Sequence, residues 1–137
     1  MANLGAKAPQ ILLVEMDDET RPLLRHNLEN EGFDVIVTLE EKDAIARMKD
    51  ATDVPDLILL NQVNSSANGF IEMGLRIRSQ LNFSESMPIV VIAEHFAKEL
   101  TGQNQQVGNY EYIAYLEDGQ QLIDLLTQLC AQNFDLT

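Results

Sequence analysis

The chain has 137 residues, of which 45% are hydrophobic and 23% are charged, as is typical of one folded domain. Its single cysteine, Cys130, excludes a disulfide-stapled scaffold and a cysteine-rich zinc module. Acidic residues outnumber basic ones 22 to 9, and the formal net charge of −13 argues against general binding to nucleic acid or to an anionic membrane.

Neither a membrane span nor a secretory leader is expected. The longest uninterrupted apolar run, residues 89–93, is far shorter than the roughly 20 residues that cross a bilayer. Residues 1–10 contain one Lys and no long apolar core, unlike a signal peptide. We therefore expect a cytoplasmic protein.

Short apolar runs alternate along the chain with segments of helical periodicity. In chain order the pattern predicts strand 11–14, helix 21–31, strand 35–37, helix 41–49, strand 57–60, helix 70–81, strand 89–92, a weak segment 97–107, strand 110–113 and helix 119–132. Three of the strands are almost continuous in Ile, Leu and Val, which is typical of strands covered on both faces. The alternation predicts an α/β fold, a three-layer α/β/α sandwich with a mostly parallel sheet, in one domain spanning 1–137 with a core of about 11–132.

Local start signals agree with these helices. The candidate capping residues are Asp17, Asp18 or Thr20 for the first helix, Thr38 with Glu41 as a capping box for the second, and Asp118 for the last.

The segment 97–107 is a poor helix. Gly102 lies in its middle, four consecutive amide residues follow Gly102, and Leu100 and Val107 are its sizeable apolar side chains. A helix with so little to bury gains little from packing, and an internal Gly costs about 1 kcal/mol relative to Ala. We expect this element to be short, irregular or mobile.

Four sequence blocks carry a specific resemblance: ILLVEMDDETRPLLRHNLENEGFDV, PDLILLNQVNSSANGF, PIVVIA and GNYEYIAYLEDGQQL. In this order and spacing they resemble the receiver domain of bacterial response regulators over about 11–129. The resemblance implies a flavodoxin-like fold with a five-stranded parallel sheet in the order 2-1-3-4-5.

Receivers phosphorylate themselves on an aspartate after the third strand, with help from an acid pair that holds Mg²⁺, a hydroxyl residue and a lysine. The resemblance places the phosphoacceptor at Asn61, the acid pair at Glu15 and Met16, the Ser/Thr at Ala93 and the lysine at Tyr115. It also matches the carbonyl of Val63 to a metal ligand, and Leu116 to a proline that follows a cis peptide bond.

These positions define a degenerate phosphorylation pocket in which Glu15 alone keeps the expected chemical character. An amide nitrogen cannot form an acyl phosphate, and Asn61 and Met16 lack the anionic oxygens that Mg²⁺ prefers. Ala93 has no hydroxyl, and Tyr115 brings no positive charge to a phosphoryl group. We therefore expect no catalytic residue, no bound metal and no cofactor, with Asp17 or Asp18 as the one open route to residual metal binding.

The sequence therefore favours an atypical single-domain response regulator, a pseudo-receiver, which is not an enzyme and acts in two-component or phosphorelay signalling as a phosphorylation-independent protein-interaction module. Two alternatives stay open: a phosphoacceptor receiver with an unorthodox site, and a small flavodoxin-like ligand binder. Without the cis-proline pattern, we expect a trans Tyr115–Leu116 bond and a Tyr115 side chain that is free to turn outwards.

The end of the chain suggests where a partner binds. After Lys98 there is no Lys or Arg, and Glu111, Glu117, Asp118 and Asp124 follow. These acids form either a solvated surface or a face that docks a signalling partner with a basic surface, and a homodimer is the other partner considered. Tyr112 matches the aromatic switch position that receivers couple to the Ser/Thr after the fourth strand; with Ala93 there, we expect one resting arrangement.

Overall fold

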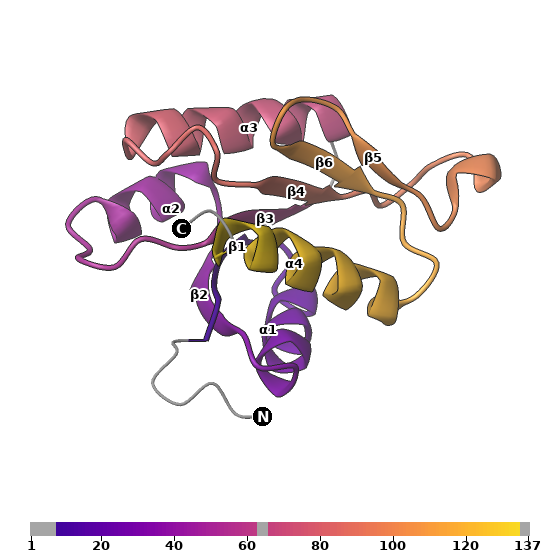
Figure 1. Cartoon of the computed structure of the whole chain (residues 1–137), viewed down its shortest axis with the longest axis horizontal. Helices are drawn as coiled ribbons and strands as arrows, with labels where there is room; N and C mark the ends of the chain where they lie inside the picture. The colour runs from indigo at the N-terminus through magenta and orange to yellow at the C-terminus, as the bar shows by residue number, and fades with distance from the viewer. Residues whose placement is uncertain (1–7, 63–65, 135–137) are drawn as a thin grey trace.

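Six strands of the described residues form one sheet with helices on both faces (Figure 1). The computed structural model describes residues 8–62 and 66–134. The strands are β1 (Gln10–Val14), β2 (Asp34–Thr38), β3 (Leu57–Asn61), β4 (Ile89–Ile92), β5 (Asn104–Gln106) and β6 (Glu111–Ala114). The helices are α1 (Thr20–Asn30), α2 (Glu41–Met48), α3 (Ala67–Gln80) and α4 (Gly119–Phe134), with a single 3-10 turn, η1 (Lys98–Leu100).

The sheet separates two hydrophobic layers, because successive residues of a strand point to opposite faces. In β1, Ile11 and Leu13 face the layer beneath α1 and α4, whereas Leu12 and Val14 face the layer beneath α2 and α3. Each of these side chains is at most 1% exposed, and burying one of this size contributes about 1.5–3 kcal/mol. The predicted three-layer α/β/α architecture is confirmed. None of the helices in the described ranges combines the length and apolar character needed to cross a membrane.

The sheet itself corrects the prediction of five parallel strands in the order 2-1-3-4-5. The observed order is β2-β1-β3-β4-β6-β5, and β5 runs antiparallel to β6 at the edge. Segment 97–107 forms no α-helix: after the turn η1, its amide-rich part pairs its backbone with β6 as β5. Gly102, with a positive φ of 87°, donates its N–H to the Tyr115 carbonyl at 2.7 Å where the chain enters this pairing. No local pattern predicts a strand here, because Asn-Gln-Gln has no apolar alternation.

Two of the predicted helix caps are confirmed. A carboxylate oxygen of Asp17 accepts a hydrogen bond from the Thr20 N–H at 2.7 Å, at the start of α1. At the start of α4, Asp118 accepts from the Gln121 N–H at 3.0 Å. Both carboxylates satisfy donors that the first turn of a helix leaves without intrahelical partners.

The predicted capping box at α2 is wrong. The Thr38 hydroxyl is buried and donates to the Leu13 carbonyl at 2.8 Å, which ties β2 to β1. Glu41 turns to α3, where its two carboxylate oxygens accept from Arg76 at 2.8 and 2.7 Å. At both residues a tertiary partner replaces the local one. Thr38 gains a buried hydrogen bond, and Glu41 gains two hydrogen bonds to a charged guanidinium.

Gly74 provides a stability test of the packing between α3 and β4. A Cβ atom at Gly74 would lie 2.6 Å from Cγ2 of Ile89 and 3.3 Å from Cδ1 of Leu60. We therefore expect Gly74→Ala to destabilise the protein by roughly 1–2 kcal/mol in urea unfolding, despite the better helix propensity of Ala. Gly119→Ala is the matched control, because nothing lies within 4 Å of its Cβ. Equal stability of the two variants would contradict the close contact at Gly74.

Candidate functional site at the carboxyl ends of β1 and β3

Glu15 and Asn61 meet where β1 and β3 end side by side in the sheet. The amide nitrogen of Asn61 donates to Oε1 of Glu15 at 2.6 Å, and the backbone N–H of Asp17 donates to Oε2 at 3.1 Å. Glu15 is fully buried, with 0% of its surface exposed, although it carries an ionisable group. The chain's own donors therefore occupy both carboxylate oxygens of the one acid that the predicted pocket retains.

The environment of Glu15 shifts its pKa above the ordinary value of a carboxyl group. Burial raises the pKa of Glu15, and the hydrogen bonds from Asp17 and Asn61 oppose this rise without cancelling it. The positive charge of Arg21 also opposes the rise, but the Arg21 guanidinium donates to the backbone carbonyl of Glu15 at 3.0 Å and pairs with Asp18 at 2.5 Å. The site thus holds one carboxyl group that amide donors satisfy.

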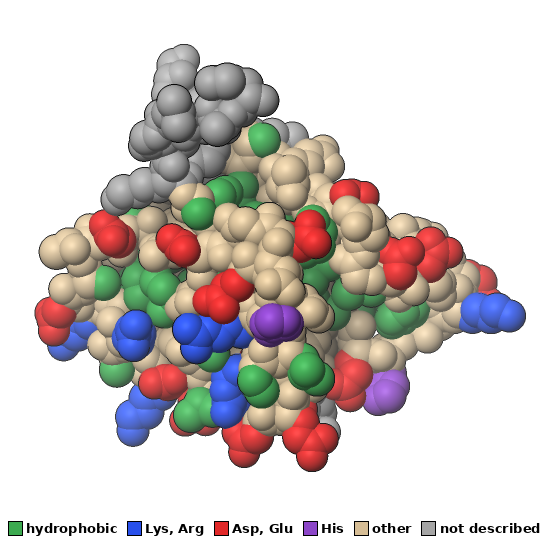
Figure 2. All heavy atoms as spheres, turned by 90° about the horizontal axis from the view of Figure 1, so that it is seen from below, with side chains coloured by type: hydrophobic (Ala, Val, Ile, Leu, Met, Phe, Trp, Pro, Cys, Tyr) green, Lys and Arg blue, Asp and Glu red, His purple; other side chains and the backbone are tan. Residues whose placement is uncertain are grey.

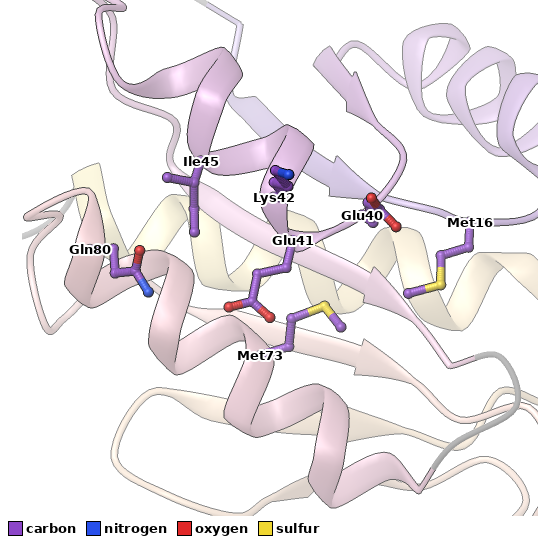
Figure 3. A pocket seen from close by; sticks show the side chains of 7 residues that line it. All are labelled: Met16, Glu40, Glu41, Lys42, Ile45, Met73 and Gln80. Atoms are coloured by element: carbon purple, nitrogen blue, oxygen red, sulfur yellow. The ribbon is translucent and has the colours of Figure 1, made fainter.

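Met16 lies outside this contact. Its side chain is 38% exposed and lines a groove of about 540 Å³ between α2 and α3. In Figure 3, Met16 enters the groove from the end of β1, while Glu41 and Met73 lie side by side between the two helices. The hydrogen-bonded Arg76 lowers the pKa of Glu41. The predicted acid-pair position therefore contributes a thioether to a neighbouring groove.

Ala93 and Tyr115 follow β4 and β6 and pack in the layer beneath α2 and α3. Ala93 is 6% exposed, and its N–H donates to the Ala114 carbonyl at 3.0 Å. The Tyr115 ring is half-buried and meets Phe96 edge-to-face, with 5.2 Å between ring centroids. Its hydroxyl lies 3.5 Å from Oε1 of Gln105 in β5. In this structure the Tyr115 ring therefore packs against Phe96, and its hydroxyl lies near the edge strand β5.

The backbone after β6 has the predicted geometry. The described residues contain no cis peptide bond, so the Tyr115–Leu116 bond is trans, as expected.

Tyr112, the predicted switch aromatic, lies on the opposite face of the sheet from Ala93. It pairs with Val90 in the register of β4 and β6 and packs in the layer beneath α1 and α4. Burial raises the pKa of its phenol, and the Glu111 charge adds to the rise. In this structure the two switch positions therefore do not contact each other.

The acids after β1 have other partners among the described residues. Asp17 caps α1, and hydrogen bonds from Thr20 lower its pKa. Asp18 is exposed and pairs with Arg21. Within the described ranges, no three His, Cys, Asp or Glu side chains come together as a metal-binding group, and Val63 lies outside those ranges. Mg²⁺ prefers several carboxylate and carbonyl oxygens, so the residues present do not fit the ion that receivers use.

One member of the predicted docking face is corrected. Glu111 is largely buried and forms an ion pair with Arg78 at 2.9 Å, while Arg78 also donates to the Met87 carbonyl at 2.9 Å. The Arg78 side chain is 11% exposed and that of Glu111 12%, so this pair joins α3 to β6 and offers no free charge. No local pattern indicated it, because the two residues are far apart in the sequence.

The other three acids stay on the surface near the start of α4. Glu117, Asp118 and Asp124 are exposed. Asp124 accepts from the side-chain amide of Gln120 at 2.9 Å, and Asp118 caps the helix, so their partners are uncharged. In Figure 2, which views the molecule from the side of α1 and α4, acidic side chains are spread over the face, while most basic ones gather at the left.

Comparison with known proteins finds one relative of similar length and two longer regulators. An uncharacterized 14.6 kDa protein from the sodA1 3' region of Leptolyngbya boryana is 30% identical over 120 residues, which cover 88% of each chain. The phosphate regulon transcriptional regulatory protein PhoB of Rhizobium meliloti is 34% identical over 84 residues, 61% of this chain and 35% of PhoB. The alkaline phosphatase synthesis regulator PhoP of Bacillus subtilis is 31% identical over 91 residues. The chain spans about a third of the length of these two regulators.

Solved structures give the fold. A response regulator receiver protein from Sinorhizobium medicae superimposes with a TM-score of 0.66 at 22% identity, covering 90% of this chain and 95% of that one. The chemotaxis protein CheY4 of Vibrio cholerae gives a TM-score of 0.63 at 22% identity, covering 90% and 99% of the chains. No protein-family model matches the sequence.

These similarities show that the chain is a domain with the fold of response-regulator receivers. It belongs to one family with the Leptolyngbya boryana protein, a relative of similar length whose name states no function.

The buried carboxyl group predicts a pH dependence of stability. The raised pKa means that folded Glu15 keeps its proton to a higher pH than it does in the unfolded chain, where its ordinary value is 4.5. This contribution is complete below the unfolded-state pKa and is lost as pH rises through the folded-state pKa. We expect the stability advantage of the wild type over Glu15→Gln to shrink as pH rises through this window.

Urea unfolding between pH 4 and pH 7 measures this difference. The exposed Glu85→Gln variant controls for the loss of an acid. An advantage that grows with pH would mean that the hydrogen bonds to the carboxylate outweigh its burial.

Proposed function

We propose that the protein is a pseudo-receiver: a receiver-type interaction module of two-component signalling that works without aspartyl phosphorylation and is not an enzyme. The hydrogen bond of 2.6 Å between the Asn61 amide and the buried Glu15 carries the proposal. It puts an amide donor where receivers present the nucleophilic carboxylate, and directs that donor at the remaining acid.

The chemistry of the neighbouring positions supports the same function. Phosphoryl transfer needs an acceptor, oxygen ligands for a metal, and donors that stabilise the developing charge. Met16 faces a groove, and Ala93 brings no side-chain donor. The Tyr115 hydroxyl lies toward Gln105 in β5. Each position that resembles a catalytic one thus has a structural contact of another kind.

Electrostatics explains how these substitutions coexist in a stable protein. A lone buried carboxyl group that amides satisfy needs no counter-ion, whereas a buried ammonium without its acids would be costly. The loss of the acceptor, of one metal-binding acid and of the lysine is therefore one consistent change in charge. A site of this kind is suited to a fixed conformation that a partner recognises.

The partner we propose is a signalling protein with a basic surface. Glu117, Asp118 and Asp124 present negative charge around the start of α4, in a part of the chain without any Lys or Arg after Lys98. Charge complementarity of this kind mainly speeds association and selects the partner.

The central prediction concerns phosphorylation. With acetyl phosphate and Mg²⁺, we expect no phosphate adduct by intact-protein mass spectrometry, under conditions that phosphorylate a working receiver. Asn61→Asp should also stay unmodified, because it sets a second carboxylate against Glu15 and supplies neither the lysine nor the hydroxyl.

Two results would contradict this expectation. A hydroxylamine-sensitive phosphate on the wild type would favour the phosphoacceptor alternative. Efficient modification of Asn61→Asp alone would show that the remaining groups suffice for catalysis.

A separate prediction concerns docking. Proteins that immobilised wild type retains from the native source should elute earlier in a NaCl gradient from a triple variant, Glu117→Gln, Asp118→Asn and Asp124→Asn. Asn at 118 can still cap α4, so the fold should persist. The matched control neutralises three exposed acids elsewhere, Asp50, Glu72 and Glu85. Equal elution from both triple variants would mean that the acids near the start of α4 form only a solvated surface and do not bind the partner.

A further inference from the structure

The outer edge of the sheet is formed by β5, and this edge is uncharged. Residues 102–110 contain no Asp, Glu, Lys or Arg, in a chain with a net charge of −13. All nine are exposed, and Val107 is an exposed apolar side chain at 45%. Edge strands are normally protected from further pairing by charged side chains, by Pro or by a covering element. Apart from its short length of three residues, β5 has none of these protections: residues 102–110 carry no charge and no Pro, and all of them are exposed.

The backbone of β5 has polar groups that point away from the sheet. The Val107 N–H donates to the Glu111 carbonyl, and the Tyr115 N–H donates to the Gln103 carbonyl, both at 2.8 Å. In an antiparallel pair, every second residue of a strand hydrogen-bonds to the same neighbouring strand. The backbone N–H and C=O groups of Gln103, Gln105 and Val107 therefore point toward β6. The N–H and C=O groups of Asn104 and Gln106 therefore point outward from the edge.

Side-chain hydrogen bonds hold this edge in an extended form. Nε2 of Gln121 in α4 donates to Oδ1 of Asn104 at 2.8 Å. Nε2 of Gln106 donates to the carbonyls of Gly108 and Asn109, each at 2.9 Å. A strand that is already ordered loses less conformational entropy when it pairs.

The chemistry of the edge fits a second copy of this chain. A symmetric interface must be self-complementary, and an amide meets this condition because it both donates and accepts, whereas like charges repel. Two copies that each carry −13 repel one another over most of their surfaces, and the uncharged edge is where they can approach.

We propose that two copies pair antiparallel through β5 and so continue one sheet across a homodimer. Gln105 faces the same residue of the second copy, and the backbone groups of Asn104 exchange hydrogen bonds with those of Gln106. In this register Gly102 lies opposite Gly108, so glycines flank the paired segment at both ends. The proposal rests on the proposed function only in naming one partner of the interaction module; it requires nothing of the phosphorylation chemistry.

Sedimentation velocity of the full chain over a wide concentration range tests the dimer. Gln106→Pro removes the outward N–H and keeps every bond to β6, and Pro is tolerated on edge strands. We expect it to weaken dimerisation about tenfold or more, because the symmetry removes the bond twice. Gln106→Ala is the matched control: it loses the same side chain but keeps the N–H, and should dimerise far better than Gln106→Pro.

Amide exchange followed by NMR locates the interface in the wild type. The amides of Asn104 and Gln106 should be unprotected at low micromolar concentration and protected near millimolar concentration. Those of Gln105 and Val107, which face β6, should be protected at both. This readout needs no variant, so a misfolded Gln106→Pro would leave the test intact.

Salt separates this dimer from docking of a basic partner. Added NaCl should strengthen association of two acidic copies and weaken binding of a basic protein. A monomer at every concentration overturns the proposal, and so does a dimer that leaves the Asn104 and Gln106 amides unprotected. Protection that appears only when a different protein is added also overturns it, because the occupant is then not a second copy.

Discussion

The central strands of the sheet are buried on both faces, and this constraint governs the rest of the molecule. Ile11 to Leu13 in β1, Leu57 to Leu60 in β3 and Ile89 to Val91 in β4 have no exposed surface. A polar side chain in such a strand would lose its contact with water and would need a buried hydrogen-bond partner. Polar side chains therefore lie at the ends of these strands, and at the carboxyl ends Glu15 and Asn61 come together.

At that edge, the decisive feature is the charge balance around one buried acid. Glu15 has lost its contact with water, and the backbone of Asp17 and the amide of Asn61 replace it. A second acid at position 61 would bring like charges together and would need a cation or a metal to hold them. Glu15 and Asn61 therefore form one hydrogen-bonded unit at the ends of β1 and β3.

A shortage of apolar side chains determines the structure of segment 97–107, at the edge of the sheet. Segment 97–107 has too few apolar side chains to pack as a helix, and its backbone is satisfied instead by pairing with β6. The segment therefore presents an amide-rich strand edge in place of a helical surface. Gln105 of this edge lies near the Tyr115 hydroxyl, and Asn104 is hydrogen-bonded to Gln121 in α4. The surface available to partners is therefore a consequence of local sequence composition.

The sequence by itself determined the alternation of strands and helices, the two-sided burial of the central strands and the residues at the strand ends. These follow from local periodicity and spacing, as do the caps at Asp17 and Asp118. Tertiary structure alone decided the Glu15–Asn61 hydrogen bond, the turn of Met16 into the groove, the burial of Glu111 against Arg78 and the extra strand β5. Each of these joins residues distant in sequence or selects among local alternatives of similar energy. A side chain's neighbours across a sheet or between helices depend on how the whole chain packs, which no local pattern specifies.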